Sequence, residues 1–218
     1  PEEYEGIKVY IDDYTIIPTI TVRVIEGQEF VRSSVVDGIE ITMTALPGVF
    51  PADAELSVTK IEDEESIKKI EEAIQNSIDA ELEAEAAELV EDGEEAEETF
   101  GKVEKTISFD ILVLDENGNE LQPQIPDGVD INDAIKVTFK QVVSQLETEY
   151  DEQEEYLSMD VYYIDDAMTQ AEQLPTSVEG DDMTFSPEHF SIYSCTCKVS
   201  SAKYVYTWQQ LYKATYNK

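Results

Sequence analysis

The 218-residue sequence predicts a mainly β fold, an antiparallel β-sandwich with one long inserted acidic α-helix and a short C-terminal helix. Apolar and polar side chains alternate in several short segments, which is the period of a strand with one buried face. These segments follow one another without alternating helices, which favours antiparallel sheets over a parallel α/β sheet. Between about residues 63 and 98 the period changes to that of a helix. We expect an immunoglobulin-like or ZU5-like arrangement of the two sheets.

The first predicted strands lie at residues 19–24 and 39–44, where isoleucine, valine and methionine alternate with threonine and charged side chains. An Asp-Gly pair at 37–38 is a typical turn before the second of them. The Leu-Pro-Gly sequence at 46–48 ends that strand, because proline has no amide donor and glycine tolerates positive φ. Another short strand begins at residues 56–58.

The predicted helix has a single apolar stripe. Its members are Ile67, Ile70, Ile74, Ile78, Leu82, Ala86 and Leu89. Asp63 or Ser66 is suited to cap its start, and Gly93 follows its end. Residues 79–98 contain eleven acidic and no basic residues. An acidic stretch of this kind is usually a solvated helix face followed by an acidic loop, and the alternative is a helix that binds a basic partner.

The later strands are predicted from the same alternation. They lie at residues 107–114, 135–139, 159–163, 183–185 and 190–195. Asn117-Gly118, which follows the first of these strands, is well suited to a type I′ hairpin turn.

The abrupt change of charge after Cys197 is the clearest boundary in the sequence. Residues 1–197 carry a net charge of −40, whereas residues 198–218 contain four lysines and no acid. We therefore expect residues 1–197 to form the sandwich module and residues 198–218 to form a basic aromatic tail. The tail has a candidate helix after Thr207, and it packs on this domain or begins a following module.

The formal net charge of −36 excludes some classes of partner. Such a field repels phosphate backbones and anionic lipid heads, so we expect neither nucleic-acid binding nor membrane insertion. No apolar run approaches the ~18 residues of a membrane-spanning helix.

Few residues are suited to catalysis. His189 is the only histidine, and Ser191 lies near it in the sequence. A hydrolase would need these two and a carboxylate to meet in space. The simpler interpretation is a structural histidine at a strand entry, held by a hydrogen bond to its ring nitrogen. We therefore expect no catalytic residue.

Two further groups are candidates for metal binding. Cys195 and Cys197 point to the same face of an extended strand, but zinc would need two more ligands and only His189 is close in sequence. We expect two reduced or weakly oxidised thiols. Paired aspartates at Asp165-Asp166 and Asp181-Asp182 are candidate calcium ligands. The alternative is diffuse counterion binding on a very acidic surface. We therefore expect no cofactor, and after zinc is set aside calcium is the candidate metal that remains.

Three motifs resemble a module found in long cell-surface and adhesin-like proteins of Gram-positive, often gut-dwelling, bacteria. Residues 45–48 and 54–58 resemble its "LP-G…A-x-L-x-V" opening. Residues 109–123 resemble its "D-I-x-x-x-D-x-x-G-x-E-x-x-P" hairpin, and residues 185–193 its closing "F-x-x-x-H-F-S-x-Y" strand. Residues 206–211 resemble the "T-W-x-x-L" that often opens the next module. The resemblance implies a β-sandwich without known catalysis.

We therefore expect a non-enzymatic extracellular module of a bacterial cell-surface protein, acting as a spacer or as an adhesion unit. Its partners would be an unidentified protein or surface ligand and the neighbouring modules of a longer chain. The alternative is an acidic domain that recruits a basic partner through residues 79–98. A remote alternative is a hydrolase that uses His189.

Overall fold

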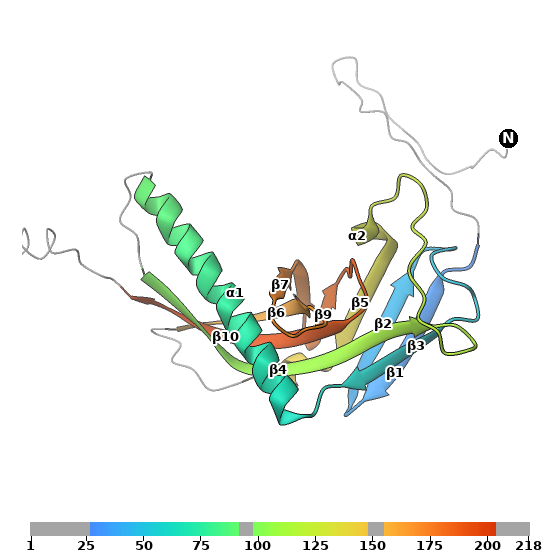
Figure 1. Cartoon of the computed structure of the whole chain (residues 1–218), viewed down its shortest axis with the longest axis horizontal. Helices are drawn as coiled ribbons and strands as arrows, with labels where there is room; N and C mark the ends of the chain where they lie inside the picture. The colour runs from blue at the N-terminus through green and yellow to red at the C-terminus, as the bar shows by residue number, and fades with distance from the viewer. Residues whose placement is uncertain (1–26, 92–97, 148–154, 204–218) are drawn as a thin grey trace, which may run out of the picture.

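The computed structural model describes residues 27–91, 98–147 and 155–203. These residues form two five-stranded antiparallel sheets that share one apolar core, and a long helix lies outside them (Figure 1). The predicted mainly β fold with two antiparallel sheets is therefore confirmed. The strand predicted at residues 19–24, the acidic loop at 92–97 and the tail helix after Thr207 lie outside the described residues.

The first sheet has the strand order β1-β2-β5-β9-β8. Its strands are β1 (Phe30–Val36), β2 (Ile39–Ala45), β5 (Ile135–Lys140), β9 (Asp182–Phe185) and β8 (Thr176–Glu179). Asp37 and Gly38 join β1 to β2 and both have positive φ, of 50° and 82°. Two left-handed residues in a two-residue turn match the right-handed twist of a hairpin, as the Asp-Gly pair predicts.

The second sheet has the strand order β3-β4-β10-β6-β7. Its strands are β3 (Glu55–Lys60), β4 (Glu98–Leu114), β10 (Ile192–Lys203), β6 (Glu155–Ile164) and β7 (Ala171–Leu174). The central strand, β10, pairs with both β4 and β6. It continues to Lys203, so the boundary expected after Cys197 falls inside a paired strand. The change of charge there coincides only with a register shift between Cys197 and Lys198.

The core lies between the two sheets, where the inward side chains of both meet. Phe139 of β5 stacks between Phe109 of β4 and Phe185 of β9, with ring centroids 5.4 and 5.6 Å apart. Each of the three is at most 2% exposed. The alternation that predicted β4, β5 and β9 therefore marks the inward faces of those strands.

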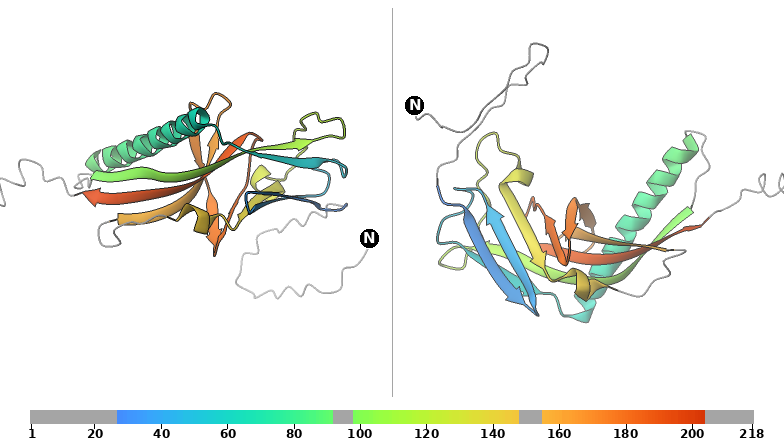
Figure 2. Two further views of the ribbon diagram at one scale, coloured as in Figure 1. Left: turned by 90° about the horizontal axis from the view of Figure 1, so that it is seen from below. Right: turned by 180° about the vertical axis from the view of Figure 1, so that it is seen from behind.

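The helix α1 (Glu64–Glu91) confirms the predicted insertion between strands. The amide of Ser66 donates to Asp63 Oδ1 at 2.8 Å, which makes Asp63 the cap. Figure 2 shows α1 lying across the second sheet, on the side away from the first sheet. The apolar cluster beneath it contains Ile70, Ile74 and Ile78 of α1 and Tyr162, Ile164 and Ile192 of the sheet. Gly101 of β4 admits the helix closely, because a Cβ there would lie 2.7 Å from a methyl group of Ile78.

The turn after β4 differs from the expected type I′ turn. Gly118 has a φ of 80°, but Asn117 does not have positive φ. The Asp115 carboxylate accepts hydrogen bonds from the amides of Asn117 and Asn119, both at 2.8 Å. Because these bonds close the turn locally, one left-handed residue is enough.

Two one-turn helices, α2 (Ile131–Ala134) and α3 (Val143–Leu146), flank β5. No helix among residues 27–91, 98–147 and 155–203 is both long and apolar enough to cross a membrane.

Candidate functional site

His189 lies in the loop between β9 and β10, and its role differs from the expected one. Its exposed ring packs against Tyr163, with centroids 5.8 Å apart. Its main-chain carbonyl, and not a ring nitrogen, accepts the hydrogen bond that fixes the loop, and the donor is the Tyr193 hydroxyl. Burial raises the pKa of Tyr193, so this hydroxyl stays protonated and able to donate.

Ser191, the candidate nucleophile, is buried and belongs to another contact. Its hydroxyl donates to Asp166 Oδ1 at 2.9 Å. Among the described residues no hydrogen bond joins the His189 ring to a hydroxyl group. The Ser–His–Asp arrangement that a hydrolase of this type requires is therefore not assembled here.

Both cysteines are free and lie in the core between the sheets, on the inward face of β10. They share a face, as an extended strand requires, and they lie in the middle of β10, which continues beyond the predicted end of this strand at residue 195. Burial raises the pKa of both thiols. Because the thiolate is the form that attacks substrates and binds zinc, these side chains act here as small apolar groups.

Asp165 and Asp166 lie in the turn between β6 and β7. Asp165 Oδ1 accepts from the amides of Thr169 at 2.7 Å and Gln170 at 2.8 Å, and these hydrogen bonds lower the pKa of Asp165. Asp166 accepts from Ser191, as described above. Both carboxylates therefore hold this end of the second sheet together.

Asp181 lies in the turn between β8 and β9, and Asp182 is the first residue of β9. Asp181 accepts from the hydroxyl of Ser144 at 2.9 Å, and Asp182 accepts from the amide of Gln141 at 3.1 Å. Within the described ranges, no three histidine, cysteine, aspartate or glutamate side chains are grouped to hold a metal ion. Calcium binding at the four aspartates stays a prediction.

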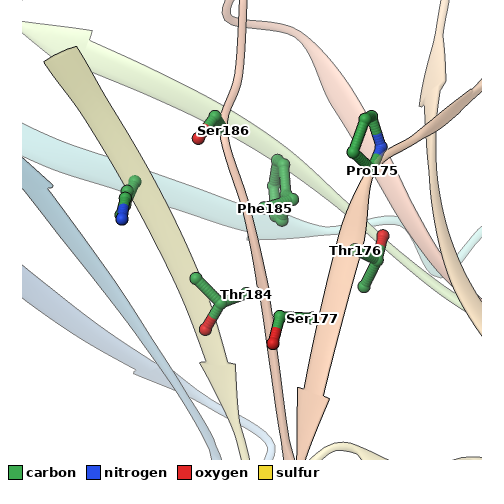
Figure 3. Close-up of a pocket in the computed structure, with 7 residues that line it drawn as sticks. Pro175, Thr176, Ser177, Thr184, Phe185 and Ser186 are labelled. Atoms are coloured by element: carbon green, nitrogen blue, oxygen red, sulfur yellow. The ribbon is translucent and has the colours of Figure 1, made fainter. Parts of the chain in front are cut away.

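A pocket of about 340 Å³ opens on the outer face of the first sheet, where β5, β9 and β8 run side by side (Figure 3). Its lining includes one lysine, four serine or threonine residues and two apolar residues. The lining residues are Lys136, Pro175, Thr176, Ser177, Thr184, Phe185 and Ser186. Lys136 comes from β5, Ser177 from β8 and Thr184 from β9, so strand pairing alone brings them together.

The pocket lies at one end of a row of hydroxyl side chains that crosses the whole sheet. The register aligns Ser33, Thr42, Thr138, Thr184 and Ser177, one from each strand. Hydroxyl oxygens of Ser33 and Thr42 lie 2.9 Å apart, as do those of Thr138 and Thr184. These side chains point outward because both neighbours of each threonine in the sequence point into the core.

Charge distinguishes this pocket from four other depressions on the described surface. Four others have linings that include glutamate or aspartate, whereas this one has no carboxylate in its lining. Lys136 has no salt-bridge partner within the part of the chain that the structure describes. Lys136 also lines a second depression, which includes Glu29 and Asp133, so the absence of carboxylates is a property of this pocket and not of all the surroundings of the lysine.

The hydroxyl groups of the pocket keep hydrogen-bonding capacity. Ser186 donates to the carbonyl of Asn132 at 2.8 Å, so its oxygen can still accept. Thr176 donates to the carbonyl of Leu174 at 2.8 Å and already accepts from the amide of Val161 at 3.1 Å. Ser177 and Lys136 make no side-chain hydrogen bond to another described residue. The pocket therefore offers donors and acceptors together.

Sequence reasoning missed this site, since its residues lie far apart in the chain. The signal that could have found the hydroxyl row is a repeated triplet, with a threonine between two apolar residues, at residues 41–43, 137–139 and 183–185. No family model, curated protein or solved structure matches this chain.

Proposed function

We propose that the chain is a non-catalytic extracellular module of a bacterial cell-surface protein, an immunoglobulin-like or ZU5-like sandwich that acts as a spacer or adhesion unit. The proposal rests mainly on the structural role of the motif residues, which form strand ends and turns and make main-chain hydrogen bonds. Leu46 ends β2 with a hydrogen bond from its amide to the Ala134 carbonyl, and Gly48 turns the chain with a φ of 84°. His189 serves through its carbonyl and not through its ring.

The contact of Tyr193 with His189 supports the immunoglobulin-like type in particular. A tyrosine two residues before a core cysteine, with its hydroxyl bonded to the main chain a few residues upstream, fixes the corner between strands in such sandwiches. Tyr193 precedes Cys195 by two residues and bonds four residues upstream. The strand orders of the two sheets differ from those of an immunoglobulin domain, so the likeness is limited to this corner.

The net charge fits a position on a cell surface. A charge of −36 keeps a module soluble and repels it from a wall that is itself anionic, which extends a chain of such modules outward.

Antibody labelling tests the location. Antibodies raised against the folded chain should label intact cells of the source organism as strongly as permeabilised cells, and external protease should remove the signal. Labelling that requires permeabilisation would contradict the proposal.

A second candidate function, recruitment of a basic partner, is favoured by the exposed acids of α1. Asp79, Glu81 and Glu83 are exposed and form no salt bridge among the described residues. A lysine-rich peptide should then associate with an on-rate that falls steeply between low and ~0.15 M salt. The triple variant with Asp79→Asn, Glu81→Gln and Glu83→Gln should have a lower on-rate at low salt and a weaker salt dependence, and an unchanged on-rate would contradict the idea.

A further inference from the structure

The pocket beside Lys136 has the hydrogen-bonding pattern of a polyol site. An anion needs donors and a cation needs acceptors, whereas each hydroxyl of a sugar both donates and accepts. Lys136 supplies donors only, Ser186 keeps acceptor capacity because its proton is engaged, and Ser177 can do both. Figure 3 shows the Ser177 and Thr184 side chains next to each other on adjacent strands.

The size and the apolar groups of the pocket agree with this chemistry. A volume of about 340 Å³ lies at the small end of the ~300–1,000 Å³ range of ligand pockets, enough for about one or two sugar rings. Pro175 is exposed, whereas the ring of Phe185 is 2% exposed and packs in the core against Phe139 and Tyr193. A proline ring can pack against the C–H face of a sugar while the hydroxyl groups are bound from the side.

Charge selects among the sugars. The net charge of −36 opposes the approach of an anionic sugar but does not act on a neutral one. The lining contains no carboxylate that would attract a cation. A neutral ligand would therefore not bury an unpaired negative charge.

From these observations we propose that the pocket lined by Lys136, Thr176, Ser177, Thr184 and Ser186 binds a neutral sugar residue of a glycan. The inference rests on the adhesion function proposed above and names its ligand class. Lys136 donates to sugar hydroxyls, Ser177 and Ser186 complete the hydrogen bonds, and Pro175 contacts the ring.

Amide chemical shifts of the whole chain test the proposal directly. Methyl glycosides of glucose, galactose and N-acetylglucosamine, at up to ~10 mM because single-sugar contacts saturate near millimolar concentration, are compared with methyl glucuronide. We expect at least one neutral glycoside to shift the amides of Ser177, Thr184 and Ser186, with a Kd that does not change between low and ~0.15 M salt. Tighter binding of the glucuronide, or no shift with any glycoside, would overturn the proposal.

Matched variants assign the binding to this pocket. Lys136→Met and Ser177→Ala should each raise Kd about fivefold to tenfold. Two controls should leave Kd unchanged: Lys105→Met, which removes another lysine without a salt bridge in the described structure, and Ser33→Ala, at the far end of the same hydroxyl row. Unchanged binding by both pocket variants would overturn the assignment.

The two proposals fail separately. Surface labelling of intact cells combined with the absence of sugar binding would remove the glycan site and leave the surface module. If the chain binds sugar but antibodies reach it only in permeabilised cells, the surface module would be removed and the glycan site would remain.

Discussion

The outer faces of the two sheets differ although both sheets have five antiparallel strands. The second sheet presents Tyr162, Ile164 and Ile192 outward, and α1 covers them. The first sheet presents a row of serine and threonine side chains, and no element of the described structure packs over that row (Figures 1 and 2). Apolar side chains on the outer face of a sheet must be covered, here by a helix, whereas serine and threonine side chains can stay exposed to water or to a ligand.

This difference suggests why the long helix is inserted where it is. Strand β3 ends beside β4, so a helix between them lies directly over the second sheet. Its isoleucines bury the outward apolar residues of β6 and β10. The acidic residues of its opposite face remain in water, which is the usual division of an amphipathic helix.

The largest effect should come from the covered face. Ile74→Ala removes a side chain that is 0% exposed and leaves a cavity between α1 and the sheet, so we expect a loss of about 2–5 kcal/mol in the free energy of unfolding. Thr138→Ala on the bare face is the control and should cost less than about 1 kcal/mol. Urea unfolding measures both, and equal losses would show that the helix does not stabilise the second sheet.

The next effect concerns the close approach of α1 to the sheet at Gly101. Gly101→Ala places a methyl group against Ile78, and we expect a loss of about 1–3 kcal/mol. In the Ile78→Ala background the same substitution should cost almost nothing, because the opposing methyl group is gone. Urea unfolding of the four proteins gives the coupling. A loss that persists in that background would mean that the helix does not contact this glycine.

A pH effect should come from the inner face of the second sheet. Burial raises the pKa of Cys195 above that of an unfolded thiol, ~8.5. Above that pH the unfolded chain loses a proton that the folded chain keeps, so stability falls as pH rises, by about 1.4 kcal/mol at pH ~9.5. Thermal melting of the Cys195→Ala variant should show a shallower decline between pH ~8 and ~9.5. An identical slope would show that the thiol is not responsible.

The smallest expected change in the free energy of unfolding comes from two buried tyrosines on opposite faces of the second sheet. Tyr193→Phe loses the hydrogen bond to the His189 carbonyl and should cost about 1 kcal/mol. Tyr162→Phe loses only a 3.3 Å contact with Gln173 and should cost less. Urea unfolding measures both. The reverse order would mean that the corner at His189 is not a strong restraint.

Periodicity predicted the elements whose apolar residues lie on the buried face. The isoleucine spacing predicted α1, and alternation predicted β2, β4, β5 and β6. Strand β1 was missed because Val31 and Val35 are 47% and 69% exposed, so its apolar pattern marks the solvent face. Strands β7 and β8 were missed because both are short and largely polar.

The candidate site was beyond prediction for a different reason. Alternation tells which side chains of a strand point outward, but it does not tell which strands are neighbours. The pocket depends on the order β5-β9-β8, and this order joins residues 136, 177 and 184. His189 was singled out for its ring, although the fold uses a main-chain carbonyl that any residue could supply.

The central position of β10 has a consequence for synthesis on the ribosome. Strands β4 and β6 are made first, but each meets its main partner only when residues 192–203 have emerged. At a translation rate of about 5–20 residues per second, the edge of β6 that pairs with β10 stays unpaired for several seconds. The growing chain therefore carries unpaired strand edges until residues 192–203 have emerged, and its high negative charge then repels neighbouring nascent chains of the same kind.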